Sequence, residues 1–105
     1  MQKDHRMIED AISEVGISED GGLYVRPSST TFEHIWRAAV EVHWDLQNRR
    51  LFGPKPRGWT YVDWFKQIVA AAADEYGILL RLTPQTAWAN ISDTIRTEIT
   101  SAAQR

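Results

Sequence analysis

The pattern in this chain that comes nearest to a reactive site is a histidine between two carboxylates. His43 lies two positions from both Glu41 and Asp45. If this segment is extended, all three polar side chains point to one face, because side chains alternate along a strand. An imidazole beside carboxylates could transfer protons or contribute to a metal site. If the segment is helical, His43 turns away from both carboxylates and the cluster dissolves.

Metal binding at this cluster needs more ligands than the sequence supplies. A metal site usually takes three or four convergent donors, and only His5 and His34 remain to add nitrogen ligands. The absence of cysteine excludes thiolate catalysis and cysteine-ligated zinc or iron–sulfur centres. We expect no metal, no cofactor and no catalytic residue, and we interpret His43 first as a hydrogen-bonded structural side chain. A small enzyme that uses His43 with Glu41 or Asp45 is the third hypothesis for function.

A basic loop follows this cluster, with four cations in nine residues and no acid among them. Basic groups attract phosphate and aromatic faces stack on bases, so the pattern is typical of a loop that binds single-stranded nucleic acid. A solvated loop whose cations pair with the chain's 14 acidic residues also explains this pattern. We prefer that interpretation because the net charge is −2. A nucleic-acid-binding module that uses loop 49–57 is the second hypothesis. The residues concerned are Arg49, Arg50, Lys55 and Arg57, with Phe52, Trp59 and Tyr61 among or beside them.

Five tryptophans in 105 residues supply more aromatic area than a small core needs. Trp36 lies on an apolar helical stripe and Trp64 borders another, so both are expected to be structural. Trp44, Trp59 and Trp88 have no such stripe and could line a pocket or a subunit interface, where tryptophan is enriched. Polar side chains near Trp88 could orient a ligand there, and they are Thr83, Gln85, Thr86 and Asn90.

The leading hypothesis is therefore a non-catalytic, homo-oligomeric binding protein with a tryptophan-rich site in region 43–64, which Trp88 could join. Such a site would hold a small molecule or a partner subunit, since pockets are commonly lined by aromatic side chains with a few polar groups. The candidate site residues are Trp44, Trp59, Trp88, His43, Arg50, Arg57 and Tyr61.

Length and composition define the class of protein that positions these side chains. A chain of 105 residues holds one core, so we expect a single domain over 1–105. The hydrophobic share of 43% and the charged share of 25% are typical of a globular chain, and a pI of 5.9 is inconsistent with an overall basic surface. The first twenty residues lack an apolar run long enough for a signal peptide, and the longest run, 68–73, is too short to span a membrane. We expect a cytoplasmic protein without membrane association.

In the first half of the chain, apolar spacing predicts two helices and a strand. One helix is expected over about 3–15. The β-prone run 23–26 predicts a short strand. A second helix is expected from about 31 to between 40 and 45, and Thr30 with Glu33 has the spacing of a capping box at its start.

The second half is expected to alternate hairpin, helix, strand and helical structure. An α+β fold follows, in which a small, mainly antiparallel sheet of three to four short strands packs against three to four helices. The expected elements are a hairpin over 42–52, a loop over 53–59, a helix from Thr60 to Gly77, a central strand over 78–82, and one or two helices over 84–103 that Thr83 and Ser92 could cap.

Four segments of the chain resemble small uncharacterised proteins encoded by mobile integron gene cassettes of bacteria. The similarity spans about 20–95 and includes no catalytic motif. It implies a compact bacterial protein without an assigned activity, from a group whose members often look like homo-oligomers with small-molecule pockets. It carries no functional residue over to this chain. The segments are Leu23-Tyr24-Val25-Arg26-Pro27, Val42-His43-Trp44-Asp45, Trp64-Phe65-Lys66-Gln67-Ile68 and Asp74-Glu75-Tyr76-Gly77.

Overall fold

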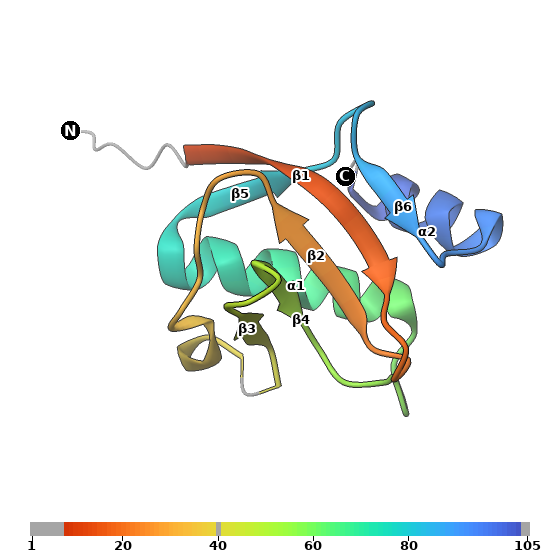
Figure 1. The fold of residues 1–105 in the computed structure, drawn as a ribbon, viewed down its shortest axis with the longest axis horizontal. Helices are drawn as coiled ribbons and strands as arrows, with labels where there is room; N and C mark the ends of the chain where they lie inside the picture. Colours follow the sequence, from red (N-terminus) through yellow and green to blue (C-terminus); the bar gives the residue numbers. More distant parts are fainter. Residues whose placement is uncertain (1–7, 40, 104–105) are drawn as a thin grey trace.

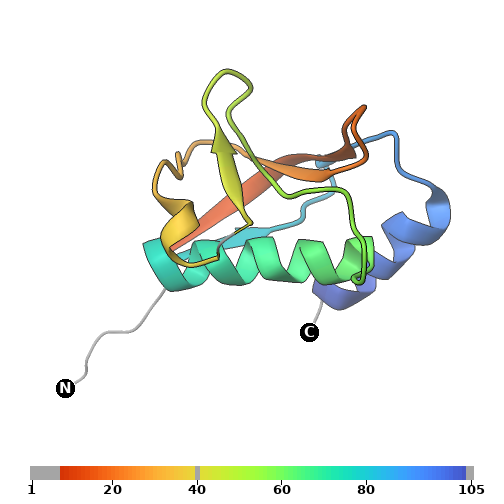
Figure 2. The same ribbon diagram turned by 90° about the horizontal axis from the view of Figure 1, so that it is seen from below.

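One long helix packs across a single face of a six-stranded sheet, and a shorter helix lies beside one end of the long helix (Figures 1 and 2). The structure is a computed structural model that describes residues 8–39 and 41–103. Over these residues the fold is α+β, as predicted, but it has six strands and two α-helices where three to four of each were expected. The elements are β1 (Ile8–Ile17), β2 (Leu23–Pro27), the 3-10 turn η1 (Ile35–Arg37), β3 (His43–Asp45), β4 (Arg50–Phe52), α1 (Tyr61–Tyr76), β5 (Ile78–Arg81), β6 (Ala87–Ala89) and α2 (Asp93–Ala103).

The sheet is organised around β1, which pairs with three other strands. The strand order is β3-β4-β2-β1-β5, and β6 also pairs with β1, beyond the end of β5. The pairings β1–β2, β2–β4 and β3–β4 are antiparallel, whereas β5 and β6 run parallel to β1. The expectation that 78–82 lies centrally was wrong, because β5 is the last strand of this path. The edge of β5 that pairs with no described strand forms part of a groove between the two helices.

β1 occupies the segment in which a helix was expected over 3–15. Residues 3–7 lie outside the described part of the chain, and residues 8–17 form a strand. The buried side chains Asp10 and Ile12 alternate as they do in a strand, but a register shift between Ile12 and Glu14 makes Val15 the next buried residue. A bulge adds one residue to the strand and so changes the apolar spacing from two to three. That spacing imitates the period of a helix.

The second helix, expected from about 31, is reduced to the 3-10 turn η1. Phe32, Ile35 and Ala39 are buried as the apolar stripe predicted, but Trp36 is 55% exposed and is not a core residue. The Phe32 ring packs edge-on against Tyr76 at the end of α1, with ring centroids 4.9 Å apart. Long-range aromatic packing fixes this segment together with the short-range hydrogen bonds of the 3-10 turn, such as that from the backbone of Ala38 to the carbonyl of Ile35. Val40, part of the expected stripe, lies outside the described residues.

The helix α1 confirms the prediction for 60–77. The side chain of Thr60 accepts a hydrogen bond from the backbone of Asp63, whose side chain accepts one from the backbone of Thr60. Gly77 ends the helix with φ of 67°, a left-handed conformation that glycine adopts without steric cost. The predicted hairpin is also present as β3 and β4.

Residues 84–103 contain one helix, which answers the question that the sequence left open. Thr83 and Pro84 do not start a helix, because the buried Thr86 hydroxyl donates a hydrogen bond to the carbonyl of Ile12 and fixes a turn before β6. Ser92 caps α2 as expected, since its hydroxyl accepts a hydrogen bond from the backbone of Ile95. No helix among the described residues is long and apolar enough to cross a membrane.

The core lies between α1 and the sheet. The buried face of α1 packs on β5 and β2. The side chains of Leu23, Val25 and Leu51 on the sheet are fully buried in this core. Trp64 is 8% exposed and is a core residue, as expected. A Cβ atom at Gly53 would lie 2.9 Å from the Trp64 ring, so the absence of a side chain there lets the ring approach the backbone.

Candidate functional site

The three tryptophans proposed for binding lie in three different environments. Trp44, on β3, is partly buried, and its ring centroid is 5.8 Å from that of Phe32. Trp59 is 47% exposed and packs on Trp64 with ring centroids 5.0 Å apart. Trp88, on β6, is partly buried beneath the guanidinium of Arg96, 5.3 Å from the ring centroid. The structure therefore associates each ring with a different neighbour.

The three residues of the His43 cluster do not form one site, because Asp45 is hydrogen-bonded to another residue. His43 and Asp45 belong to β3, whereas Glu41 precedes the strand and is exposed. The Asp45 carboxylate accepts hydrogen bonds from the side chain and the backbone of Asn48, which lower the pKa of Asp45 below its usual value. His43 is exposed, and its ring lies 5.4 Å from that of Phe52. The carboxylate on its own strand is thus held by other partners.

The cations of the loop 49–57 are not gathered around one partner. The guanidinium of Arg50 lies 4.0 Å from the centroid of the Tyr24 ring, and its Nε is 3.7 Å from an Asp45 oxygen, too far for a hydrogen bond. Arg49, with φ of 54°, and Arg57 are exposed. Tyr61, whose ring was expected to stack on a base in the nucleic-acid hypothesis, donates its hydroxyl hydrogen bond to the carbonyl of Gly21 at 2.8 Å.

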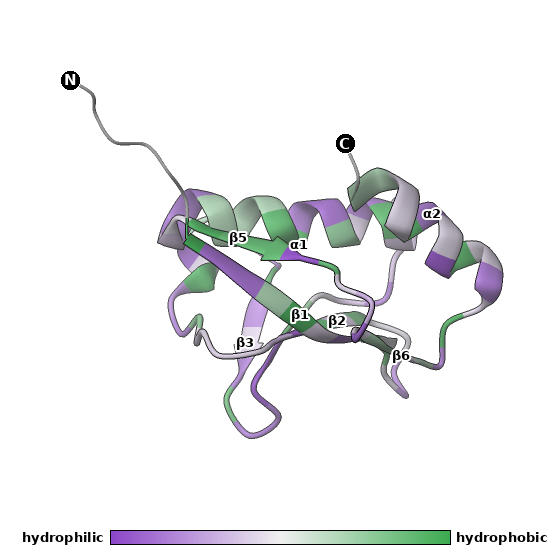
Figure 3. Cartoon of the chain, turned by 90° about the horizontal axis from the view of Figure 1, so that it is seen from above, coloured by the Kyte–Doolittle hydropathy of each residue, from purple (hydrophilic) through white to green (hydrophobic). Residues whose placement is uncertain are grey.

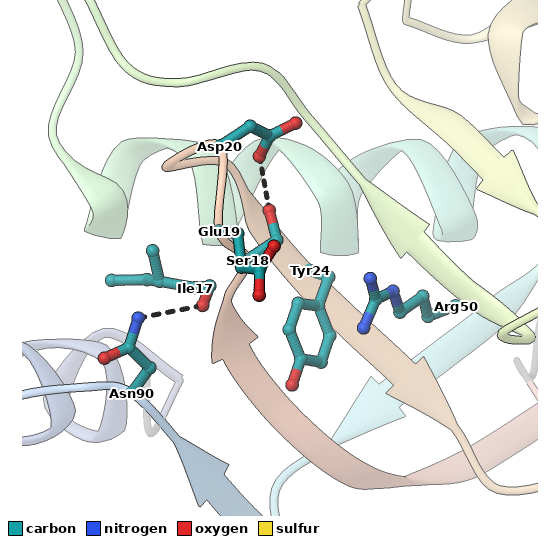
Figure 4. Close-up of a pocket in the computed structure, with 7 residues that line it drawn as sticks. All are labelled: Ile17, Ser18, Glu19, Asp20, Tyr24, Arg50 and Asn90. Atoms are coloured by element: carbon teal, nitrogen blue, oxygen red, sulfur yellow. Dashed lines mark hydrogen bonds between the residues drawn. The ribbon is translucent and has the colours of Figure 1, made fainter.

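A shallow depression of about 580 Å³, here called the Tyr24 depression, lies on the sheet face opposite α1 (Figure 4). Several of its polar groups have partners within the chain, although the buried Nε of Arg50 has no hydrogen-bond partner among the described residues. Asp20 accepts hydrogen bonds from Ser18 and from the backbone of Gly22, and Asn90 donates one to the carbonyl of Ile17. Figure 4 shows Arg50 beside the Tyr24 ring. Its lining residues are Ile17, Ser18, Glu19, Asp20, Tyr24, Arg50 and Asn90.

The charges at this depression shift the acidity of its carboxyl and phenol groups. Hydrogen bonds from Ser18 and Gly22 lower the pKa of Asp20. Burial raises the pKa of Tyr24, and the nearby charge of Glu14 raises it further. Glu14 is ion-paired with Arg26 on the neighbouring strand. This carboxylate beside Tyr24 therefore already has a partner within the sheet.

A larger cavity of about 790 Å³, here called the α1–α2 groove, lies between the two helices and is closed along one side by β5. Its volume falls in the range of small-molecule pockets, roughly 300–1,000 Å³. Figure 3 shows β5, mostly hydrophobic, running from the end of α1 toward the side on which α2 lies. The lining residues are Phe65, Lys66, Val69, Ala70, Ala73, Leu79, Leu80, Arg81, Leu82, Thr83, Pro84, Trp88, Arg96, Thr100, Ala102 and Ala103.

Of the predicted site residues, Trp88 alone lines this groove. β6 pairs in register with β1, so that Trp88 lies opposite Val15, and the hydrogen bond from Thr86 to Ile12 fixes the turn that leads into it. Thr83, named from the sequence as a polar neighbour of Trp88, also lines the groove, but sequence reasoning missed the walls formed by the helices and β5. The signal that could have indicated β5 was the largely apolar run 78–82, which was interpreted as a central strand but includes groove-lining residues at 79–82.

The groove has an uneven distribution of charge. Among residues 8–39 and 41–103, three cations line it, Lys66, Arg81 and Arg96, and no carboxylate does. Arg81 is paired with Glu9 at 3.4 Å, with both side chains more than half exposed, whereas no ion pair between described residues involves Lys66 or Arg96. Within the described parts of the chain, no group of three histidine, aspartate or glutamate side chains is placed to hold a metal ion.

The fold and these cavities define a class of small α+β proteins in which a mainly antiparallel sheet packs on one long helix. Residues 10–86 match the family described as Integron Cassette Protein Hfx_Cass5, and the chain belongs to this family. The resemblance noted from the sequence is thereby confirmed.

One solved structure is similar to this chain along almost its whole length. It is described as a structure from the mobile metagenome of North West Arm Sewage Outfall, Integron Cassette Protein Hfx_Cass5. The two sequences are 37% identical, the alignment covers 94% of this chain and 99% of the other, and the TM-score is 0.47. No curated protein matches the chain.

Proposed function

We propose that this integron cassette protein is a non-catalytic binding protein that takes a small molecule with an apolar body into the α1–α2 groove. The observation that carries the proposal is the composition of the groove wall. Leu79, Leu82 and Trp88 provide partly buried apolar surface, and a cavity of about 790 Å³ gives it the size of a ligand pocket. Apolar surface left partly exposed in a concave wall is stabilised when a ligand displaces water from it.

The groove explains one of the candidate tryptophans better than a purely structural role does. Trp88 has one face under Arg96 and contributes to the cavity wall, so its ring is positioned by the protein before any ligand arrives. A rigid aromatic wall costs little conformational entropy when a ligand binds. The remaining candidate residues stay predictions, because they lie elsewhere on the fold.

Binding in the groove can be tested with 1-decanol, an uncharged probe, by two-dimensional NMR of the labelled protein. We expect saturable shifts for the resonances of Leu79, Trp88 and Thr100, and none for Trp59. Ala70→Trp, at an exposed position on the groove wall, should weaken decanol binding by about tenfold or more, since its ring would fill the cavity.

Ala87→Trp is the matched control for this experiment. Ala87 is exposed and is adjacent to Trp88 on β6, but side chains alternate along a strand, so it points to the opposite face. Equal binding by both variants, or shifts that occur at Trp59 and not in the groove, would show that the site is elsewhere.

Homo-oligomer formation is a second proposal, favoured by a separate observation. Trp36, Leu46 and Trp59 are 55%, 65% and 47% exposed, and exposed large apolar side chains are frequent at protein interfaces. If Trp59 contributes to self-association, Trp59→Ala should reduce the mass measured by sedimentation equilibrium at a concentration at which the parent chain associates. A parent chain that sediments as a monomer throughout would refute this proposal.

The nucleic-acid alternative has weaker support. Arg50 is stacked on Tyr24 and close to Asp45, and Tyr61 is bonded to Gly21, so two of the side chains expected to contact a strand have intramolecular partners. Binding of a short oligonucleotide that weakens steeply with salt would restore that alternative.

A further inference from the structure

We infer that the ligand of the α1–α2 groove is an amphipathic anion, with one carboxylate or similar anionic group at the end of an apolar body. This inference rests on the proposed function and adds the chemical class and the orientation of the ligand. It follows from where the three cations of the groove lie.

The turn at Gly77 determines the position of two of these cations. β5 follows α1 through Gly77 alone and packs against the helix, so distances along both elements can be counted from this turn. Lys66 lies eleven positions before it, about 16 Å along a helix, and Arg81 lies four positions after it, about 13 Å along a strand. Both cations therefore lie at the end of the groove remote from Gly77, whereas Ala73 and Leu79 lie near the turn.

The third cation, Arg96, lies at the same end of the groove. Arg81 is in register with Ala11 of β1, and Trp88 is in register with Val15, farther along the same strand. Arg96 lies over the Trp88 ring, so its guanidinium is beyond Arg81 as seen from Gly77. The groove thus has an apolar end near Gly77 and a cationic end formed by Lys66, Arg81 and Arg96.

Charge complementarity selects the ligand. Lys66 and Arg96 have no ion-pair partner among the described residues. An anionic group at this end would be attracted by their positive charge while an apolar body covers the wall near Gly77. A cationic ligand would be repelled there, and an uncharged ligand would gain only from the apolar end. Because the lining contains no carboxylate, the described residues offer no competing anion within the groove itself.

The test compares three probes of equal chain length, decanoate, 1-decanol and decyltrimethylammonium, by isothermal titration at pH 7 and low ionic strength. We expect decanoate to bind about tenfold more tightly than decanol, and the ammonium compound to bind more weakly than both. The advantage of decanoate should decline as salt is raised, because the cations are exposed and screened. Equal affinity for all three probes would overturn the charge selection and leave the binding function intact.

Substitution locates the anionic group. Lys66→Gln and Arg96→Gln should each weaken decanoate binding by about two- to fivefold more than they weaken decanol binding, the range of one exposed charge pair. Arg37→Gln is the control, since it removes the same charge from η1, an element that does not line the groove. If Arg37→Gln weakens decanoate binding as much as the groove variants do, only the net charge matters and the inference is wrong.

Two further outcomes bear on the proposal as a whole. If neither decanol nor decanoate binds, both the groove function and this inference fail. If the protein sediments as a dimer that Ala70→Trp dissociates, and decanoate does not bind to the dimer, the groove is covered by a second copy of the chain and the small-molecule interpretation is overturned.

Discussion

The Tyr24 depression and the α1–α2 groove lie on opposite sides of the sheet, and they differ in how their polar groups are used. In the depression, Asp20 is bonded to Ser18 and Gly22, Asn90 to Ile17, and Arg50 is stacked on Tyr24. In the groove, two of the three cations form no ion pair with any described residue. The first surface has Asp20, Asn90 and the Arg50 guanidinium engaged within the chain, while the second leaves cations beside an apolar wall.

This difference separates residues that maintain the fold from residues available to a ligand. A side chain whose hydrogen bonds are made within the chain stabilises the native state, and replacing it lowers the free energy of unfolding. A cation without a partner contributes little to stability, so replacing it should alter binding alone. We therefore expect substitutions at the depression to change stability and substitutions at the groove to change affinity.

Gly22→Ala should have the largest effect on stability. A Cβ atom at this position would lie 2.3 Å from the carbonyl oxygen of Gly53, and a backbone atom cannot move aside as the end of a flexible side chain can. We expect a loss of about 3 kcal/mol and a fall in Tm of roughly 14 °C, with decanol affinity unchanged below the transition. Thermal unfolding followed by circular dichroism measures the first effect.

Gly58→Ala is the control, because a Cβ atom there meets nothing within 4 Å. It should change Tm by no more than one or two degrees, about the effect of an unstrained surface substitution. A Gly22 variant that unfolds at the parent temperature would show that the turn beside the depression is not fixed as described.

Asp10→Asn should have an intermediate effect that depends on pH. Burial alone would raise the pKa of Asp10, but hydrogen bonds from Thr30 and Ser29 outweigh it, and the pKa is lowered on folding. The stabilisation is therefore complete above the ordinary aspartate pKa of about 3.9 and is lost as the pH falls through the lower folded value. We expect the variant to be about 1.5 kcal/mol less stable at pH 7, and this difference to become smaller at pH 2, where the carboxylate of the parent chain begins to be protonated.

Urea unfolding at the two pH values measures this difference. Asp10 lies on β1 opposite Leu80 of β5, at the edge of the groove wall. A destabilisation equal at both pH values would mean that the charge of Asp10 is not what holds residues 29 and 30.

Glu9→Gln should have the smallest effect and the opposite sign. The Glu9 carboxylate is 3.4 Å from the Arg81 guanidinium, and both groups are more than half exposed, so the pair is weak. Its removal leaves Arg81 free to face a ligand, and decanoate affinity should rise by about 1.5-fold with no change for decanol. Glu75→Gln, which removes the partner of Arg37, is the control measured in the same titration.

The parts of the fold that sequence predicted correctly are those fixed by neighbouring residues. Thr60, Asp63 and Gly77 mark both ends of α1 through contacts within a few positions, so the sequence alone located the helix. The strand β1 was mistaken for a helix because its bulge between Ile12 and Glu14 depends on pairing with β2, which local spacing does not reveal. The prediction of a helix from about 31 was also wrong, since Phe32 is positioned by packing against Tyr76, 44 residues farther along the chain.

The candidate site was predictable only in part, for a related reason. Trp88 was singled out because it had no helical stripe to explain it, and it lines the groove. Lys66 and Arg96 gave no signal, because each is an ordinary exposed cation on a helix until the turn at Gly77 and the pairing of β6 bring their elements together. Trp36 showed the converse error, since an apolar stripe predicted burial for a residue that is exposed.

The position of β1 in the sheet means that this strand is synthesised well before some of its neighbours. β1 ends at Ile17, but its parallel neighbour β5 begins at Ile78, 61 positions later. At about 5–20 residues per second, a ribosome needs roughly 3–12 s to make the intervening chain. During that interval β1 can pair with β2 but has one edge without its final neighbours. The nascent chain must therefore avoid pairing that edge with other strands before β5, β6 and the groove they form have been made.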